Sequence, residues 1–211
     1  MAEGRPGIGG GIRVPAAMPD GPGAGDGPAV ASGASGHSRS RLDGRPQAVG
    51  TTAPRWRDTS PTDVPHLLRL VQALAEYERL ADRCVATEAD FRAALFGERP
   101  DATALLAESD GTPVAACIYR RTFSTFSGKP GLWIEDIFVE PAHRGMGLAR
   151  AAFAEVARRA LAQGCTALGW NVLDWNAPAI AAYRAMGAEP QTGWTDMRVS
   201  GAALAALAGK A

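Results

Sequence analysis

A glycine-containing run between an apolar stretch and a helix is the part of this 211-residue chain whose residue types are best suited to chemistry. Residues 144–150 read Arg-Gly-Met-Gly-Leu-Ala-Arg and follow an apolar stretch that ends at Pro141. A helix that begins at such a turn points several unpaired backbone N–H groups in one direction, and its dipole adds positive potential there. Gly145 and Gly147 lack a Cβ, so a ligand can come close to the backbone. The run therefore predicts a site for the phosphate or pyrophosphate of a cofactor.

Two adjacent acids, Glu135 and Asp136, lie in the apolar stretch before this turn. A carboxylate can hold a cation and can accept a proton from it, directly or through water. Successive side chains of a strand face opposite sides of a sheet, so both acids point into one site only where a bulge interrupts the strand. An exposed sheet edge would explain the same pair without any chemistry, and both interpretations remain open at this point.

The elements that position these residues follow from capping residues and apolar periodicity. Ser60-Pro61-Thr62-Asp63 and Thr87-Glu88-Ala89-Asp90 have the form of helix N-termini, for helices that we expect to run to about Arg79 and through Leu95. Apolar spacing predicts three more helices, at residues 148–164, at residues 176–187 and in the alanine-rich tail. Strands are expected at residues 55–57, 103–108, 113–123, 131–139, 166–173 and 194–199.

This order of elements predicts an α+β fold, with a mixed, mostly antiparallel central sheet flanked by helices. The glycine turn follows the fourth strand and not the first, which excludes a doubly wound dinucleotide-binding fold. Residues 1–53 hold 13 of the 25 glycines and 6 of the 15 prolines and contain no Phe, Tyr or Trp. We therefore expect a disordered Gly/Pro/Ala-rich extension over residues 1–53 and one domain over residues 54–211.

Composition excludes several classes of function. The formal net charge is zero, so we expect no nucleic acid partner. Cys84, Cys117 and Cys165 are far apart and form no Cys-x-x-Cys pair, so we expect neither disulfides nor a metal site. No apolar stretch reaches the length of a membrane span, so no membrane association is expected. A reduced, cytoplasmic setting follows from the cysteine usage.

Residues from about 55 to 200 resemble the GNAT superfamily of acetyl-CoA-dependent N-acetyltransferases, and most closely its diamine branch, which includes the spermidine/spermine and thialysine acetyltransferases. The similar stretches cover most of this region in the order found in the family. They are Glu76-Tyr77-Glu78, Phe96-Gly97-Glu98-x-Pro100, Ile134-Glu135-Asp136-x-Phe138-Val139, Arg144-Gly145-x-Gly147, Trp175-Asn176-x-Pro178-x-Ile180-x-x-Tyr183, Gly187-Ala188 and Gly193-Trp194.

This resemblance implies acetyl-CoA as co-substrate and assigns residues to it. Backbone groups of Ile137, Phe138 and Val139 would lie along the pantetheine arm, since its amides can pair with an open strand edge. The turn would hold the pyrophosphate, and the start of the later helix would line the other side of the cofactor. The residues concerned are Arg144, Gly145, Met146, Gly147, Leu148, Ala149 and Arg150 in the turn, and Asn176, Ala177, Pro178 and Ala179 at the helix start.

The same resemblance implies two catalytic residues. Tyr183 matches the tyrosine of the family that protonates the departing CoA sulfur, and a phenol with a reference pKa of about 10 is protonated at neutral pH. Glu135 matches the acid that helps to deprotonate the amine, which leaves Asp136 a structural or supporting part. An amphipathic-helix tyrosine in the core would explain Tyr183 without catalysis, but its motif favours the acid.

Substrate contacts are implied for Tyr77 and Glu78, for Glu135, and for Gly169, Trp170 and Asn171. The chain departs from the family at Thr192, where an acid is usual, and at Arg120 and Arg121, where uncharged aromatic residues are usual. Both departures remove negative potential from the presumed channel. We therefore expect a short amine, or an amino-acid-like substrate whose carboxylate an arginine could pair, to be preferred over a long tetra-amine.

We therefore expect an enzyme that transfers acetyl from acetyl-CoA directly to a primary amine of a small polyamine or lysine-like molecule. The resemblance also implies a homodimer. One alternative is a protein or antibiotic N-acetyltransferase of the same superfamily. The other is a CoA-binding regulatory module without catalysis, and activity against any amine would exclude it.

Overall fold

The computed structural model describes residues 55–210, and the expectation for residues 1–53 lies outside this range. The strands are β1 (Arg55–Asp58), β2 (Thr103–Ser109), β3 (Thr112–Ser124), β4 (Lys129–Val139) and β5 (Leu168–Trp170). The α-helices are α1 (Val64–Tyr77), α2 (Glu88–Phe96), α3 (Leu148–Ala162), α4 (Ala177–Ala185) and α5 (Gly201–Leu207). Three 3-10 turns complete the described elements: η1 (Pro61–Asp63), η2 (Ala81–Arg83) and η3 (Pro141–His143).

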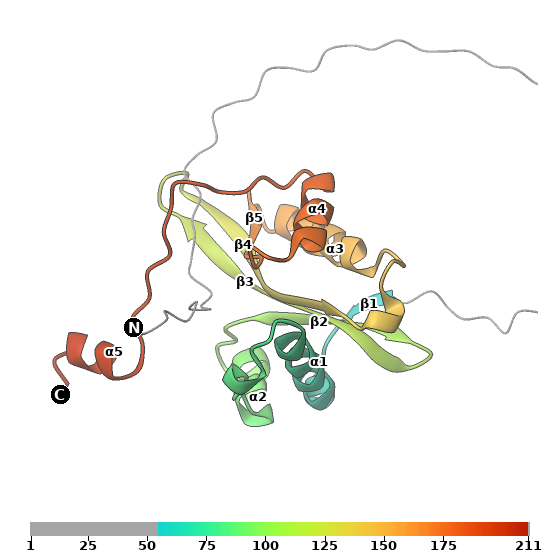
Figure 1. Ribbon diagram of the computed structural model, residues 1–211, viewed down its shortest axis with the longest axis horizontal. Coiled ribbons are helices and arrows are strands. Elements are labelled where there is room, and N and C mark those ends of the chain that lie inside the picture. Colours follow the sequence, from blue (N-terminus) through green and yellow to red (C-terminus); the bar gives the residue numbers. More distant parts are fainter. Residues whose placement is uncertain (1–54, 211) are drawn as a thin grey trace, which may run out of the picture.

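The strands form one sheet in the order β1-β2-β3-β4-β5. The pairs from β1 to β4 are antiparallel, and β4 pairs with β5 in parallel. Helices α1 and α2 cover one face of the sheet, and α3 and α4 cover the other (Figure 1). The predicted α+β fold with a mixed, mostly antiparallel sheet is therefore confirmed.

Alternation along the strands builds a hydrophobic layer on each face of the sheet. On one face, Leu67 and Leu70 of α1 pack with Leu106 and Ile118. On the other face, a second layer is formed by residues of α3 and the intervening strand positions, namely Phe153, Val156, Leu105, Cys117 and Tyr119. Successive residues of β2 and β3 therefore pack into opposite layers. Because residues opposite each other in paired strands face the same side, the pairing of β3 with β4 fixes the face to which each polar residue of β4 points.

Capping residues define the starts of α1 and α2 as the sequence predicts. The Thr87 side chain accepts a hydrogen bond from the Asp90 backbone N–H, and the Asp90 carboxylate accepts one from the Thr87 backbone. Ser60 precedes η1, which leads directly into α1, and its backbone N–H donates to Asp63. Helix α1 ends at Tyr77, two residues before the expected end.

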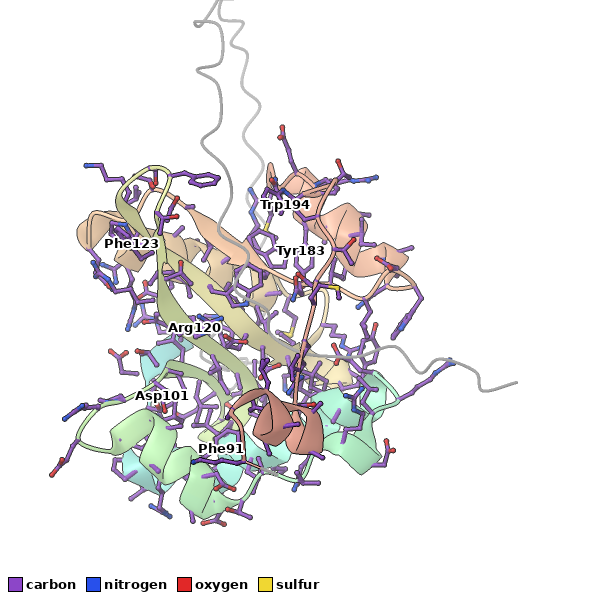
Figure 2. The ribbon with its side chains drawn as sticks, turned by 90° about the vertical axis from the view of Figure 1, so that its left-hand side faces the viewer. Phe91, Asp101, Arg120, Phe123, Tyr183 and Trp194 are labelled. Atoms are coloured by element: carbon purple, nitrogen blue, oxygen red, sulfur yellow. The ribbon has the colours of Figure 1, made fainter. Side chains whose placement is uncertain are left out.

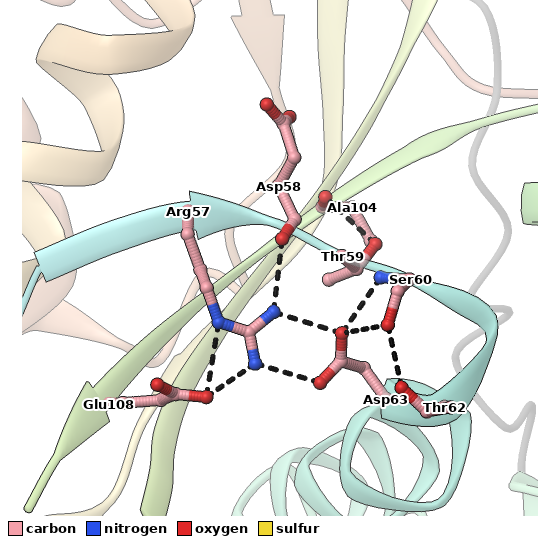
Figure 3. Close-up of polar contacts among 8 residues, drawn as sticks. All are labelled: Arg57, Asp58, Thr59, Ser60, Thr62, Asp63, Ala104 and Glu108. Carbon is pink, nitrogen blue, oxygen red and sulfur yellow. Dashed lines mark hydrogen bonds and ion pairs between the residues drawn. The ribbon is translucent and has the colours of Figure 1, made fainter. Parts of the chain in front are cut away.

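Arg57 fixes the entry to α1 by joining β1 to η1 and β2 (Figure 3). Its guanidinium donates two hydrogen bonds to the Asp63 carboxylate, at 2.9 and 2.8 Å, and also pairs with Glu108. Asp63 is buried, with 7% of its surface exposed, and it also accepts from Ser60. The hydrogen bonds from Arg57 hold the pKa of Asp63 well below its usual range, against the opposing effect of burial. This bidentate pair offsets the desolvation of the carboxylate.

Two strand predictions need correction. The strand expected at residues 166–173 is confined to Leu168–Trp170, because the chain turns away afterwards and Asn176 donates to the Leu173 carbonyl. Residues 194–199 form no strand. Their alternating pattern indicates β-propensity, but a strand forms only beside an edge that supplies hydrogen-bond partners. This segment instead runs away from β5 towards α5, which stands apart from the sheet (Figure 1).

No helix within residues 55–210 is long and apolar enough to cross a membrane.

Candidate active site

The glycine turn forms a cavity of about 320 Å³ at the start of α3. Gly145 and Gly147 have φ angles of 77° and 80°, in the left-handed region that favours glycine. The first helical hydrogen bond runs from the Ala151 N–H to the Gly147 carbonyl, so the preceding N–H groups of α3 have no partner within the helix. Val139, His143 and every residue of 144–150 except Met146 line the cavity. The arrangement suits an anion such as a pyrophosphate.

Side chains in this turn have separate structural tasks. Arg144 donates from Nε to the Val139 carbonyl at 3.0 Å, which closes the turn against the end of β4. Leu148 is buried, with 5% of its surface exposed, so only its backbone can face a cofactor. The Met146 side chain is 60% exposed and does not line the cavity. The turn therefore presents mainly backbone groups.

An open strand edge leads from this cavity into the molecule. β5 pairs with β4 only from Leu132 to Ile134, so within the described chain this edge of β4 has no strand partner beyond Ile134. Ile137, Phe138 and Val139 lie in the open part, while their other edge pairs with β3. Phe138 and Val139 are buried, so their side chains pack in the core and their backbone is what the edge can offer. An arm that carries amides fits such an edge.

The start of α4 and the end of α1 meet beside this edge. The Asn176 side chain caps α4 by accepting from the Ala179 N–H at 3.3 Å, and it accepts a second hydrogen bond from the Tyr77 hydroxyl at 3.4 Å. The Arg144 guanidinium lies 4.8 Å from the centroid of the Tyr77 ring. Tyr77 therefore connects the phosphate turn with the first turn of α4, which contains Ala177, Pro178 and Ala179.

A β-bulge interrupts β4 at the acidic pair. Ile118 of β3 pairs with Asp136, and Tyr119 pairs with Ile134, so Glu135 is the extra residue between them. The bulge that would let both acids face one side is thus present, although the sequence alone did not predict it.

Both acids lie on the α1 side of the sheet. Asp136 is opposite Ile118, whose side chain packs in the α1 and α2 layer. Glu135 forms an ion pair with Arg120, which lies two residues after Ile118 on β3 and so on the same face. Figure 2 shows Arg120 on this strand. Glu135 is therefore already paired with a cation, whereas Asp136 points into a cavity.

That cavity measures about 270 Å³ and lies between the end of α1, η2, β4 and the C-terminal segment. Asp136 and Glu78 both line it. Burial, and then the charge of Glu135, raises the pKa of Asp136 from 3.8 to about 6. Burial, and then the charge of Asp136, raises the pKa of Glu78. Two partly desolvated carboxylates that disfavour their own charge form a site for a cation.

Tyr183 approaches the same region from the other face of the sheet (Figure 2). Its ring lies 5.3 Å from that of Phe153 and 5.2 Å from that of Trp170, measured between centroids. Burial, and then the charges of Cys117, Glu78 and Tyr77, raises the pKa of Tyr183 above its ordinary value of 10. The ring packs beside the layer formed by α3 and the sheet, next to Trp170 at the end of β5. A phenol held neutral in this way is suited to donating a proton.

The three residues expected on the β5 side differ in role. Gly169 pairs with Trp133, and a Cβ added at Gly169 would lie 2.8 Å from the Trp133 ring, so packing requires glycine there. Trp170 packs against both Phe153 and Tyr183, in a cluster of three rings that orients the phenol. Asn171 is exposed. Direct substrate contact by these three residues stays a prediction.

Sequence reasoning missed the position of Asp136 in the cavity and the participation of Arg83 and Arg198 in its lining. No local signal could have located them, because four separate segments form the cavity. Cys117 is fully buried beneath the site, and burial raises the pKa of its thiol to about 12. A thiol in this state is not a nucleophile.

Comparisons with known proteins agree with this arrangement. A sequence model described as the Acetyltransferase (GNAT) family matches residues 68–188. The chain therefore belongs to the GNAT family of acetyltransferases, and the resemblance seen in the sequence is confirmed. It is an acetyltransferase, and enzymes of this family use acetyl-CoA as co-substrate. The anion cavity and the open edge of β4 fit that molecule.

Among curated relatives, a thialysine N-epsilon-acetyltransferase of Bos taurus is 39% identical over 165 residues, which cover 73% of this chain and 96% of the relative. An L-ornithine N5-acetyltransferase NATA1 of Arabidopsis thaliana is 28% identical over 214 residues, covering 77% and 94%. An integron cassette protein from the mobile metagenome of V. cholerae has a solved structure with a TM-score of 0.64 at 21% identity, covering 74% of this chain and 98% of that one. The last likeness concerns the fold.

Proposed function

We propose that this protein transfers an acetyl group from acetyl-CoA to a primary amine of a small polyamine or lysine-like molecule. The observation that carries the proposal is the pair Asp136 and Glu78, which line one cavity on the α1 side of the sheet, together with the buried phenol of Tyr183, which packs against Phe153 and Trp170 on the other side. The relatives named for thialysine and ornithine act on amines that fit such a site.

The cofactor would lie along the open edge of β4. Backbone groups of Ile137, Phe138 and Val139 would pair with the pantetheine arm, and the N–H groups of residues 145–150 would hold the pyrophosphate. The first turn of α4, residues 176–179, would cover the other side. The left-handed turn and the missing strand partner support this placement.

Three carboxylates would prepare the amine. Asp136 and Glu78 hold the substrate ammonium by charge, and Glu135 accepts a proton from it through water. The bulge supports this division because it brings Glu135 and Asp136 onto one face of the sheet. Arg120 would then have to release the Glu135 carboxylate, or share it, while the proton is taken.

Tyr183 would complete the transfer. Acetyl-CoA supplies the acetyl group as a thioester. The amine nitrogen forms a bond to the carbonyl carbon, the carbon–sulfur bond breaks, and Tyr183 donates its phenol proton to the sulfur. Solvent returns a proton to the phenolate afterwards. Holding the amine and the thioester together at the open edge of β4 should supply much of the rate.

The experiment is CoA release, followed with a thiol reagent at saturating acetyl-CoA, for wild type and Tyr183→Phe. The amines are putrescine, spermidine, spermine, thialysine and lysine. Tyr119→Phe is the matched control, because Tyr119 is buried on the α3 side and its hydroxyl contacts Arg159. We expect kcat to fall about 100-fold or more in Tyr183→Phe and to change little in Tyr119→Phe. Equal loss in both variants, or no turnover with any amine, would refute the proposal.

The remaining expectations also stand as proposals. We expect a homodimer, a cytoplasmic location and no nucleic acid partner. The first follows from resemblance to the diamine acetyltransferases, the second from the cysteine usage and the third from the zero net charge. Light scattering coupled to size exclusion would test the dimer.

A further inference from the structure

One side chain, that of Tyr77 at the end of α1, contacts two segments that lie far from it along the chain. Its ring centroid lies 4.8 Å from the guanidinium carbon of Arg144, and its hydroxyl donates to the Asn176 side chain at 3.4 Å. The Trp175 ring gives a third contact, with its centroid 5.9 Å from that of Tyr77. The end of α1, the phosphate turn and the start of α4 therefore meet at one phenol.

These contacts join elements from the two faces of the sheet. Helix α1 covers one face, and α4, which Asn176 caps, covers the other (Figure 1). The edge of β4 beyond Ile134 has no strand partner within the described chain, and the two helices meet beside it. In the proposed complex acetyl-CoA lies along this same edge, between the phosphate turn and the first turn of α4. Tyr77 thus connects the two walls of the cofactor site.

Arg144 belongs to the first wall. Its guanidinium carbon lies near two rings, 4.8 Å from the centroid of Tyr77 and 5.7 Å from that of Phe138, and its Nε donates to the Val139 carbonyl. Within residues 55–210 its Nη1 and Nη2 groups donate to no other residue, and Arg144 lines the 320 Å³ cavity of the turn. A guanidinium held in this way keeps these N–H groups for a ligand oxygen and loses little side-chain entropy when it binds one.

Asn176 belongs to the second wall. Its side-chain oxygen accepts from the Tyr77 hydroxyl and from the Ala179 backbone N–H, at 3.4 and 3.3 Å. The second of these bonds is the N-terminal cap of α4, which fixes the direction in which the helix begins. The first bond ties that cap to the end of α1. The position of the first turn of α4 relative to the phosphate turn therefore depends on Tyr77.

Tyr77 lies outside the cavity proposed for the amine. This cavity of about 270 Å³, which Glu78 and Asp136 line and which we name the acceptor cavity, does not include Tyr77 in its lining. Adjacent residues at the end of α1 thus belong to different sites, Glu78 to the amine and Tyr77 to the cofactor. Contact of Tyr77 with the amine, which the resemblance to the family implies, would give a different set of kinetic changes.

We propose that Tyr77 is a positioning residue for acetyl-CoA, which holds the Arg144 guanidinium at the phosphate turn and Asn176 at the start of α4, so that both walls of the cofactor site are set before the cofactor binds. This inference rests on the placement of acetyl-CoA in the proposed function. Tyr77 acts through Arg144 and Asn176 and needs no contact with the cofactor itself. A site that already has its binding geometry binds more tightly, because less ordering has to be offset on binding.

The test measures the Kd of CoA by titration calorimetry, without any amine. Tyr77→Phe keeps the ring and removes the hydrogen bond to Asn176, whereas Tyr77→Leu also removes the ring beside Arg144. We expect Kd to rise about threefold in Tyr77→Phe and about 10-fold in Tyr77→Leu. Gln72→Leu is the control on the same helix, because Gln72 is exposed and lines neither cavity, and its Kd should equal that of wild type.

A double-mutant cycle separates positioning from a general loss of structure. Arg144→Gln removes the guanidinium, so adding Tyr77→Leu to this variant should raise Kd by only about threefold, less than the same change does in wild type. Equal factors in the two backgrounds would show that the ring does not act through Arg144 and would overturn the inference.

Steady-state kinetics then distinguish the cofactor from the amine. In Tyr77→Leu we expect KM for acetyl-CoA to rise, while KM for the most active amine of the panel above stays within about twofold. Glu78→Gln should give the reverse pattern, because Glu78 lines the acceptor cavity. A rise confined to KM for the amine in Tyr77→Leu would assign Tyr77 to the amine and overturn the inference.

Gly147→Ala, in the phosphate turn, separates a failure of this inference from a failure of the proposed function. If Gly147→Ala weakens CoA binding and Tyr77→Leu does not, the inference is wrong and the placement of acetyl-CoA stands. If neither variant changes Kd, that placement is wrong and the inference fails with it. A Kd that falls in Tyr77→Leu would show that the phenol obstructs the site, which also overturns the inference. Because CoA binding is measured without an amine, absence of turnover with every amine would count against the proposed transfer alone.

Discussion

Replacing Asp136 by asparagine should make the protein more stable and less active. The folded protein raises the pKa of Asp136 from 3.8 to about 6, mainly through burial. A difference of about two pH units corresponds to about 3 kcal/mol of unfolding free energy that the ionised carboxylate costs at neutral pH. Asparagine carries no charge, so Asp136→Asn removes this cost. Its amide still needs partners in the cavity, which offsets part of the gain.

The expected gain is therefore about 1–3 kcal/mol at pH 8, or a rise in Tm of about 2–10 °C for a domain of this size. The dependence on pH gives the sharper test. The folded pKa of Asp136 lies above the unfolded one, so the folded state binds the proton more tightly. Ionisation of Asp136 therefore lowers the free energy of unfolding of the wild type as pH rises. The stability difference between variant and wild type should be full above pH 7, about half near pH 5 and absent below pH 4.

Thermal or urea unfolding of both proteins across pH 4–8 measures this difference. Asp101→Asn is the matched control, because Asp101 is exposed between α2 and β2 and should show no such difference (Figure 2). The charge that acts on Asp136 is that of Glu135, and Asp136 in turn raises the pKa of Glu78 and of the Cys117 thiol. Activity should fall in the same variant, with kcat/KM for the amine reduced about 10-fold or more. A stability difference that is constant with pH, or an Asp136→Asn protein less stable than wild type at pH 8, would refute the reasoning.

Three further substitutions test the frame around the site. Gly147→Ala places a Cβ on a residue with φ 80° in the phosphate turn, so we expect the free energy of unfolding to fall by about 1–2 kcal/mol in thermal unfolding and the KM for acetyl-CoA to rise several-fold. An unchanged KM would contradict the role of the turn. Gly169→Ala brings a Cβ to 2.8 Å from the Trp133 ring, so we expect it to lower the free energy of unfolding by about 1–3 kcal/mol and to lower kcat more than it raises KM. A fully active and stable variant would show that β4 and β5 can move apart without loss of stability. Asp63→Asn replaces one charged partner of Arg57 by a neutral one and should lower the free energy of unfolding by about 2 kcal/mol at pH 7, measured with urea. Because the folded pKa of Asp63 is lowered, this loss should become smaller as pH falls below 4. A pH-independent loss would assign the effect to packing.

Elements with their own local signals could be predicted from the sequence. The cap at Thr87 and the glycines at 145 and 147 each act within a few residues, so neither depends on how the rest of the chain folds. The prediction of a strand at residues 194–199 was wrong for the opposite reason. The segment does alternate, but no local pattern indicates whether a sheet edge will be available to pair with it. Without such an edge its side chains stay in solvent, and Trp194 and Met197 are 59% and 88% exposed.

The acidic pair shows the same limit within the site. Glu135 and Asp136 could be found as candidates because carboxylates in an apolar strand are unusual. Their orientation depends on the register between β3 and β4, which the partner strand and the core packing determine together. The cavity beyond them is formed by four segments, so the positions of Arg83 and Arg198 could not be inferred from spacing along the chain.

The site depends on two interruptions that coincide in β4. Pairing with β5 ends at Ile134, and the bulge follows at the next residue, Glu135. The first opens an edge at which groups from both faces of the sheet can meet, so the phenol of Tyr183 can face the acids on the α1 side. The second turns both acids towards α1. Either interruption alone would leave the phenol and the carboxylates separated by a continuous sheet, or would point Glu135 and Asp136 to opposite faces. Deleting Glu135 removes the extra residue but leaves Ile134 opposite Tyr119 and Asp136 opposite Ile118, so both keep their faces and only Glu135 is lost from the site. We therefore expect the deletion to reduce kcat/KM for CoA release about as much as Glu135→Gln does, and a far larger loss would show that the bulge also holds Asp136 in place.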